Sequence, residues 1–136
     1  MKIDSIDEKI IETLRKNSRT AVTDIASSLK LTEGAVRYRI KRLVNEKVIK
    51  KFTIVSESQP SVLIAVKTEA KTDAKKISSN VMEIDGIERI YETAGDIDMM
   101  VLARVPYQNL NGVINSLRKI PGITSTSSYL ILSEKE

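Results

Sequence analysis

The sequence predicts an α+β protein in which a winged helix-turn-helix domain precedes a ferredoxin-like βαββαβ domain. The first observation is that three short segments of helical periodicity, followed by one β-rich segment, fill the first 55 residues. The second is that the remainder alternates strand, helix, strand, strand, helix, strand. A chain of 136 residues has room for two small domains, which we place at residues 1–55 and 56–136.

The first helix is predicted to begin at Asp4 or Ser5, either of which can cap its free backbone N–H groups. Its apolar residues then recur every four positions, at Ile6, Ile10 and Leu14. Because this spacing places them on one stripe of a helix, we expect that stripe to face a core.

The second and third helices are predicted on either side of the short turn "KLT". Apolar residues at helical spacing follow "SRTAV", and Asp24 lies near the positive end of that helix. Thr32 can cap the third helix, which runs to about Asn45. The segment "KVIKKFTIV" that follows is β-rich, with Phe52 and Ile54 at period two, so we expect it to form the strand of a wing.

The third helix, "LTEGAVRYRIKRL", divides into two faces when its residues are placed at about 100° each. Its core stripe comprises Val36, Ile40 and Leu43. The opposite face carries a glycine, a tyrosine and cations. No acid lies between Arg37 and Arg42, whereas a merely solvated helix surface usually mixes charges of both signs. We therefore interpret this helix as a DNA-recognition helix rather than a solvated surface.

Each outward residue of this helix has an expected contact. Tyr38 and Arg42 can reach base edges in the major groove, whereas Arg37 and Lys41 suit phosphates. Arg39 is directed against the domain body, so the sequence leaves open whether it contacts DNA. The expected DNA-contacting residues are Thr32, Glu33, Gly34, Arg37, Tyr38, Lys41, Arg42, Lys50 and Lys51.

Charge is distributed unevenly along the chain. Residues 1–55 hold 13 Lys/Arg and 7 Asp/Glu, a net +6, whereas residues 56–136 hold 9 and 11, a net −2. A basic first half fits a polyanionic partner, which we expect to be double-stranded DNA. The polar segment "SESQP", residues 56–60, lies where the sign changes and is the predicted junction between the domains.

Composition excludes several classes of function. The chain has no Cys and no His, which removes disulfides, thiolate nucleophiles, Ser-His-Asp triads and the usual zinc sites. No phosphate-binding Gly-rich loop is present either, so we expect neither an enzyme nor a metal or cofactor site. No apolar run approaches the roughly 18–20 residues that span a bilayer. The N-terminal "MKIDSIDEKI" does not resemble a secretory signal, so we expect a cytoplasmic chain without a membrane partner.

The second half contains an internal repeat. "MEIDGIERIYE" and "RKIPGITSTSS" align as Ile-x-Gly-Ile, with Gly86 matching Gly122, and each follows a helical pattern and leads into a strand pattern. "SVLIAVKT" and "DMMVLARV" are the two other predicted strands. Asp73 can cap the first helix, and Pro106 suits the start of the second. Gly95 in "AGDID" supplies the backbone freedom that a hairpin turn needs.

With these elements laid out, the chain resembles the Lrp/AsnC family of transcription regulators. The resemblance rests on "IDEKIIETL", "RTAVTDIASSLKLTEGAVRYRIKRLVNEKVIKKFTI", "YETAGDIDMMVLARV" and "IPGITSTSSYLIL". The family's Leu-Ser-x-x-x-Val-x-x-Arg-Ile-x-x-Leu run appears between Leu31 and Leu43. Its Gly-x-Tyr-Asp hairpin appears between Gly95 and Asp98, with Ile97 in place of the aromatic residue.

The resemblance implies homodimers that pair through the sheets of the ferredoxin-like domain and often gather into tetramers or octamers. It also implies that a free amino acid binds between dimers, near the hairpin and the last strand. The matching positions are Gly95, Asp96, Asp98, Thr126 and Ser128. A plainer interpretation stays open, in which the glycine and acids only make a turn and "TSTSS" is only a strand. The short segment between the domains leaves the assembly open, and Ile97 leaves the identity of the effector open.

We interpret the chain as a sequence-specific DNA-binding transcription regulator that responds to a free amino acid. The alternative is an effector-independent architectural protein that coats DNA, with the same basic half and a sheet used only for assembly. A small ferredoxin-like enzyme, such as an acyl-phosphate hydrolase, would need a Gly-rich phosphate loop with a paired Arg and Asn, which the sequence lacks. The sequence leaves the operator and the sign of regulation open.

Overall fold

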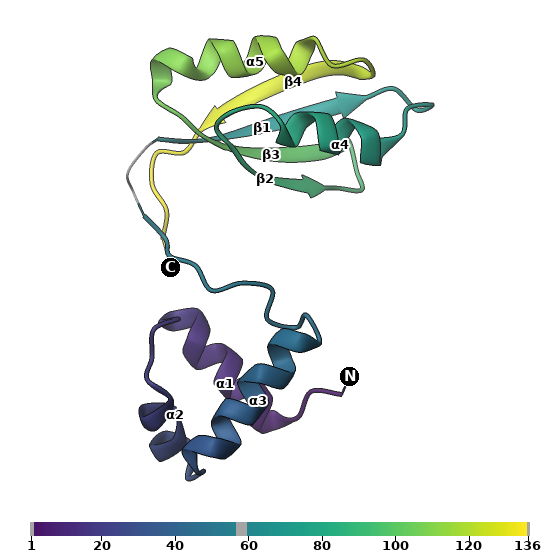
Figure 1. Cartoon of the computed structure of the whole chain (residues 1–136). Coiled ribbons are helices and arrows are strands. Elements are labelled where there is room, and N and C mark those ends of the chain that lie inside the picture. Colours follow the sequence, from purple (N-terminus) through teal and green to yellow (C-terminus); the bar gives the residue numbers. More distant parts are fainter. Residues whose placement is uncertain (1, 57–59, 136) are drawn as a thin grey trace. The chain divides into compact units, whose positions relative to one another are not determined.

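The computed structural model describes residues 2–56 and 60–135, and the chain divides into two compact units, Met1–Ser56 and Glu57–Glu136 (Figure 1). The predicted junction "SESQP" includes residues 57–59, which lie outside the described residues. None of the helices in the described parts of the chain is long and apolar enough to cross a membrane.

The first unit is built from three helices, as predicted. They are α1 (Ser5–Lys16), α2 (Val22–Leu29) and α3 (Glu33–Asn45). Asp4 begins α1 with a capping box, since its carboxylate accepts the Asp7 N–H at 2.8 Å and its own N–H donates to the Asp7 carboxylate at 3.1 Å. The Thr32 hydroxyl accepts the Ala35 N–H at 3.1 Å and so caps α3.

Each of the three helices buries one face in a common core. Its fully or almost fully buried side chains are Ile10, Ile25, Ala26, Val36 and Leu43. Lys30 ends α2 in the left-handed conformation, at φ 56°, and the Leu31 N–H returns to the Ala26 carbonyl at 2.9 Å. The turn into α3 is therefore tight, and α2 and α3 form a helix-turn-helix.

The predicted strand of a wing is absent from the described part of the first unit. Residues 50–56 form no strand, and no described residue pairs with them in a β-ladder. Phe52, Ile54 and Val55 are 51%, 78% and 71% exposed. The prediction is wrong because period-two spacing records only a side-chain preference for extended backbone. A strand also needs a neighbouring edge that takes up its N–H and C=O groups.

The second unit has the predicted βαββαβ order. Its elements are β1 (Ser61–Thr68), α4 (Ala74–Met82), β2 (Ile87–Glu92), β3 (Met99–Arg104), the 3₁₀ turn η1 (Tyr107–Asn109), α5 (Leu110–Arg118) and β4 (Ile123–Leu130). The strands form one antiparallel sheet in the order β2-β3-β1-β4, and α4 and α5 cover the same face of it (Figure 1). This is the ferredoxin-like arrangement.

The helix-covered face of the sheet forms the core of the second unit. The central strand β1 supplies Val62, Ile64 and Val66, all fully buried. Because successive side chains of a strand point to opposite faces, Leu63 lies on the face without helices. There it is in register with Leu102 of β3, and both are half-buried. The second unit therefore has an open face whose centre is apolar.

Glycines make the turns before β2 and β4, as the internal repeat predicts. Gly86 and Gly122 have φ values of +92° and +97°, a conformation that favours glycine. Asp73 caps α4 through its side chain, which confirms the prediction for that helix. Pro106 does not begin α5 directly. Its extended backbone caps η1 instead, and α5 begins only after that turn.

Candidate nucleic-acid interface

The outward side of α3 is the surface predicted to contact DNA. Tyr38 is 66% exposed, and Gly34 and Lys41 are exposed on the same side of the helix. A Cβ atom at Gly34 would meet nothing within 4 Å, so a groove wall can approach the backbone closely there. The Arg37 side chain is 66% exposed and lies 3.8 Å from Glu33, one turn earlier. An exposed ion pair of this kind is weak, so Arg37 can exchange it for a phosphate.

The orientation of this outward side is fixed by the core behind it. Val36 and Leu43 are fully buried on the opposite face of α3. Thr32 is exposed at the beginning of the helix, where its hydroxyl serves as the cap. The predicted N-terminal contacts thus lie at the end of the helix that enters the groove in helix-turn-helix complexes.

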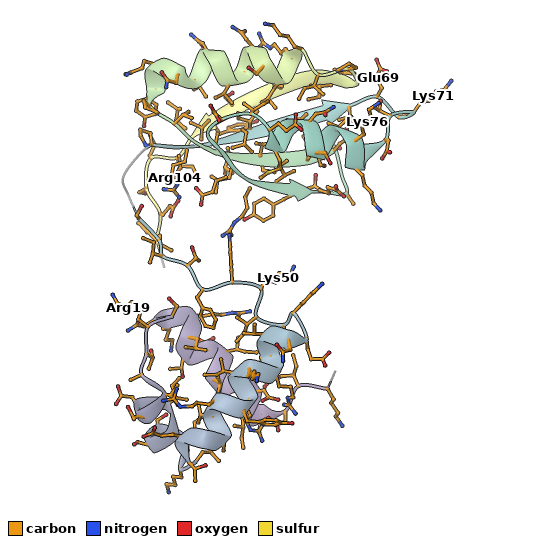
Figure 2. All side chains as sticks on the ribbon, in the orientation of Figure 1. Arg19, Lys50, Glu69, Lys71, Lys76 and Arg104 are labelled. Atoms are coloured by element: carbon orange, nitrogen blue, oxygen red, sulfur yellow. The ribbon has the colours of Figure 1, made fainter. Side chains whose placement is uncertain are left out.

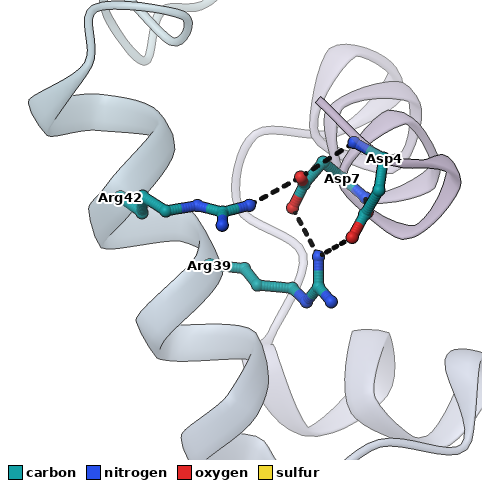
Figure 3. Close-up of polar contacts among 4 residues, drawn as sticks. All are labelled: Asp4, Asp7, Arg39 and Arg42. Atoms are coloured by element: carbon teal, nitrogen blue, oxygen red, sulfur yellow. Dashed lines mark hydrogen bonds and ion pairs between the residues drawn. The ribbon is translucent and has the colours of Figure 1, made fainter. Parts of the chain in front are cut away.

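Two other cations of α3 turn back towards α1 (Figure 3). Arg39 Nη1 donates to Asp4 Oδ2 at 2.7 Å and to Asp7 Oδ1 at 2.8 Å. Arg42 Nη2 donates to Asp7 Oδ2 at 2.7 Å. The open question about Arg39 is therefore answered by a contact with the domain body.

Arg42 does not point outward in this structure, although we expected it to reach base edges. The helical angle fixes where the Cβ atom leaves the helix. The long side chain then carries the guanidinium back to Asp7, 35 positions earlier in the sequence. Arg37 and Lys41, the two cations of α3 expected to contact phosphates, are both exposed.

We name these four residues, Asp4, Asp7, Arg39 and Arg42, the Asp7 cluster. The Asp7 side chain is fully buried, whereas those of Arg39 and Arg42 are 22% and 34% exposed. The Asp7 N–H, followed by the Arg39 guanidinium, lowers the pKa of Asp4 to about 2. Hydrogen bonds to Asp4 and then Asp7 raise the pKa of Arg39. Arg42 Nε is buried without a hydrogen-bond partner among the described residues.

Sequence spacing does not predict the Asp7 cluster. Two signals point to it in retrospect. Asp4 and Asp7 place two carboxylates one turn apart at the start of α1, and "RYRIKR" in α3 holds cations without an acid of its own. Pairing the two requires knowing that α1 and α3 are in contact, which short-range spacing does not contain.

Lys50 and Lys51 follow α3 on the irregular segment 50–56, and both are exposed. They were predicted to lie on the ribbon of a wing, which this segment does not form among the described residues. Their charge is still within a few residues of the recognition helix, so the assignment to phosphates stays a prediction.

The predicted effector residues come together near one end of β1. Asp98 Oδ2 accepts the Thr68 N–H at 2.7 Å, and the Asp98 N–H donates to the Val66 carbonyl at 3.0 Å. Thr126 of β4 is in register with Val66 from the other side. The hairpin and the last strand therefore flank the same end of β1.

The remaining effector residues, Gly95, Asp96 and Ser128, are sequence neighbours of Asp98 or Thr126, but their surroundings differ. Gly95 has φ +149°, and Asp96 beside it is exposed. Ser128 is exposed and in register with Ile64, two residues further along β1. Because one Asp98 oxygen already accepts a backbone N–H, this acid stabilises the turn as well as being a candidate ligand acceptor.

Two grooves of the second unit are lined by other residues. One, of roughly 630 Å³, runs between α4 and β2, and its lining includes Ser78, Met82 and Arg89. The other, of roughly 430 Å³, lies at the β1–α4 loop beside Lys71 and Lys76, and the Lys71 side chain projects away from the sheet (Figure 2). None of the five predicted effector residues lines either groove.

Two family models match the chain. The AsnC-type helix-turn-helix domain matches residues 3–44, and the Lrp/AsnC ligand binding domain matches residues 61–136. The chain belongs to the Lrp/AsnC family. One relative, the HTH-type transcriptional regulator LysM of Sulfurisphaera tokodaii, is 40% identical over 133 residues, with 96% of this chain and 95% of that protein covered.

Solved structures share the fold of this chain. The crystal structure of PH0061 superimposes with a TM-score of 0.88 at 23% identity, covering 100% of this chain and 97% of that one. The transcriptional regulator NMB0573 of Neisseria meningitidis, in complex with L-Met, gives a TM-score of 0.83 at 18% identity, covering 99% and 93%.

The Lrp/AsnC assignment fixes the class of function. The chain is a transcription regulator with a DNA-binding helix-turn-helix domain and a Lrp/AsnC ligand-binding domain. Its domains and relatives are those of transcription regulators and not of enzymes. The predicted family and fold are thereby confirmed.

Proposed function

We propose that the protein binds specific sites on double-stranded DNA as a homodimer or larger homo-oligomer, and that a free amino acid modulates this binding. The observation that carries the proposal is the exposed row Gly34, Tyr38 and Lys41 on a helix whose other face is locked in a core. A regulator of this kind meets its DNA in the cytoplasm, where we propose that it acts.

The division of labour on α3 follows from exposure and chemistry. Tyr38 and the first turn of the helix are proposed to read base edges, because the N-terminal part of a recognition helix enters the major groove. Arg37 and Lys41 are proposed to neutralise phosphates, which positions the helix without specifying sequence. The residues proposed to contact DNA are Thr32, Glu33, Gly34, Arg37, Tyr38, Lys41, Lys50 and Lys51.

The second unit is proposed to assemble and to bind the effector. The apolar centre of its open sheet face, which includes Leu63 and Leu102, supports a dimer formed through that face. The fold likeness to a regulator solved with L-Met supports an amino acid as the ligand class. Carboxylate and hydroxyl groups suit the ammonium and carboxylate of such a ligand. The proposed effector residues are Gly95, Asp96, Asp98, Thr126 and Ser128.

Footprinting on duplexes selected from a random pool tests the proposal. We expect discrete palindromic footprints whose half-sites lie about one helical turn apart. Tyr38→Ala should weaken selected sites more than random DNA, because it removes a base contact. Lys41→Ala should weaken both alike, because it removes a phosphate contact. Repeating the footprinting with each of the twenty amino acids should reveal one that changes the protein concentration needed for half-maximal protection.

Controls separate the parts of this proposal. Thr126→Val should abolish the amino-acid response and leave the ligand-free footprint unchanged, whereas Ser125→Ala, on the alternate face of β4, should leave both unchanged. Continuous protection of any duplex would contradict a sequence-specific regulator and support the architectural alternative. A discrete footprint that no amino acid shifts would leave the DNA function intact and remove the effector.

A further inference from the structure

The cations of α3 fall into two groups. Arg37 and Lys41 are exposed on the outward side. Arg39 and Arg42 are held against α1 by the buried carboxylate of Asp7. A helix proposed to lie against a polyanion thus has two of its four central cations engaged inside its own domain.

We propose that Asp7 limits how tightly the protein binds DNA of any sequence: by holding Arg39 and Arg42 against α1, it keeps two cations of the recognition helix off the phosphates. This inference rests on the proposed DNA-binding function. It assigns to an acid on the first helix, outside the DNA-facing surface, a role in setting the sequence-independent part of DNA affinity.

Arg42 is placed where its release would matter. It lies one turn after Tyr38 and directly after Lys41, so its position on α3 borders the outward side. Its side chain is 34% exposed, and its guanidinium is bonded to Asp7 through one nitrogen at 2.7 Å. Without that carboxylate, the side chain is long enough to turn towards the phosphates that Lys41 is proposed to contact.

The geometry of Arg42 indicates that the attraction to Asp7 decides its conformation. Arg42 Nε is buried without a hydrogen-bond partner among the described residues. A buried donor without an acceptor is unfavourable, so the conformation is not the best that this guanidinium can adopt on its own. A phosphate offers two acceptor oxygens and would satisfy the guanidinium bidentately. Removing the charge of Asp7 should therefore favour a conformation in which the Arg42 side chain points towards DNA.

Arg39 is held more firmly than Arg42. It is 22% exposed and contacts both Asp4 and Asp7, at 2.7 and 2.8 Å. Loss of the Asp7 charge leaves Arg39 with Asp4, so we expect Arg42 to account for most of the change.

The consequence for DNA binding follows from how phosphate contacts act. They contribute to binding of any sequence, and each one adds about −0.9 to the slope of log K against log salt. An additional contact from Arg42 would strengthen random DNA at low salt as much as the operator. The ratio between the two affinities would stay the same, so Asp7 limits the overall retention of the protein on DNA rather than its choice of sequence.

Salt titrations of the full-length protein on a random-sequence duplex test this inference. Lys41→Gln should reduce the slope by about 0.9 per subunit, because it removes a phosphate contact. Arg42→Gln, one position later, should leave the slope unchanged, because that cation is already engaged by Asp7. Asp7→Asn should steepen the slope by about 0.9 for each arginine released per subunit. Adding Arg42→Gln to Asp7→Asn should return the slope towards the wild-type value.

Glu12→Gln is the matched control for the change in net charge, since it removes an exposed carboxylate of α1 that pairs with Lys16. It should leave the slope unchanged. The comparison of Arg42→Gln with Lys41→Gln does not depend on whether Asp7→Asn folds.

Three results would overturn the inference. The first is an equal loss of slope in Arg42→Gln and Lys41→Gln, which would place Arg42 on phosphates already. The second is a folded Asp7→Asn protein, verified by its thermal transition, with the wild-type slope. The third is a Glu12→Gln slope as steep as that of Asp7→Asn. A wild-type protein that binds neither selected nor random duplexes would instead refute the proposed DNA function itself.

Discussion

Asp7 combines complete burial with three hydrogen-bond donors, the Asp4 N–H and the guanidinium groups of Arg39 and Arg42. A buried carboxylate that loses such partners destabilises a fold by about 3–5 kcal/mol, so these contacts belong to the structure of the domain. The cap at Asp4 could be predicted from the sequence, because capping depends on neighbouring residues. The pairing of Asp7 with Arg42 could not be predicted, because it depends on which helices are in contact.

Asp4 gives a pH-dependent prediction. Its pKa is lowered to about 2 in the folded protein, against 3.8 as the ordinary value, so its charged form stabilises the fold. This contribution is fully present above about pH 4 and is lost as the pH falls towards 2. Acid unfolding followed by circular dichroism should therefore be less steep across that window for Asp4→Asn than for the wild type.

Glu12→Gln serves as the control for this titration, since it removes an exposed carboxylate of the same helix. It should keep the acid-induced loss of stability of the wild type. An Asp4→Asn protein with the full wild-type loss between pH 4 and pH 2 would show that other acids carry the transition.

At the scale of elements, local chemistry predicted most of the fold. Caps, glycine turns and alternating patterns located all three helices of the first unit and the βαββαβ order of the second, because each of these signals acts within a few residues. The predicted strand of the wing was wrong because a strand depends on a distant partner and not only on neighbouring residues. Segment 50–56 has strand-like spacing, but a strand is completed only by a partner edge, and the sequence does not say where that edge is.

Two glycines with opposite environments test the turn before β2. Gly86 has φ +92°, and a Cβ atom there would lie 2.1 Å from Val105 Cγ1. Gly86→Ala should therefore destabilise the second unit by about 1–3 kcal/mol through strain and overpacking. Gly112 lies in α5, and a Cβ atom there would meet nothing within 4 Å. Gly112→Ala should instead stabilise the second unit by about 0.5–1 kcal/mol. Urea unfolding of both variants would measure these changes.

The two substitutions add the same methyl group. Comparing them therefore separates the cost of conformational strain at Gly86 from any general effect of introducing alanine. Equal stabilities for the two variants would mean that the turn relaxes around the new side chain. The result would then count against a fixed left-handed backbone at Gly86.

At the scale of the whole molecule, the open sheet face is the proposed contact between copies. Two rows cross it in register: Tyr91, Met100, Ala65 and Ser127, and Arg89, Leu102, Leu63 and Tyr129. Their centre is apolar, and Tyr91 and Tyr129 are 46% and 58% exposed at the sides. A surface of this kind is typical of a protein–protein interface.

Leu102→Lys should dissociate the assembly, because it places a charge at the centre of the open face. Sedimentation equilibrium should show the mass falling to that of the monomer, with weaker binding to palindromic DNA. Met82→Lys is the control, since Met82 is 49% exposed on α4, which covers the opposite face of the sheet. Unchanged mass for Leu102→Lys would exclude the open face as the contact.

The effector residues illustrate what a single chain cannot supply. The family resemblance assigned Asp98 and Thr126 to one effector site, and the structure places both beside Val66. None of the five effector residues lines either of the two grooves described for the second unit. If the ligand lies between dimers, its site is completed by a surface that no intrachain pattern encodes.

The strand order has a consequence for biosynthesis. β1 is the first strand of the second unit, and it pairs with β4, the last of its strands to be translated. The paired residues are therefore separated by more than fifty positions in the sequence. Pairing over such a distance is slow compared with contacts between successive helices. The three helices of the first unit can therefore pack while the ribosome is still making the sheet, and the helix-turn-helix domain is complete before the ferredoxin-like domain.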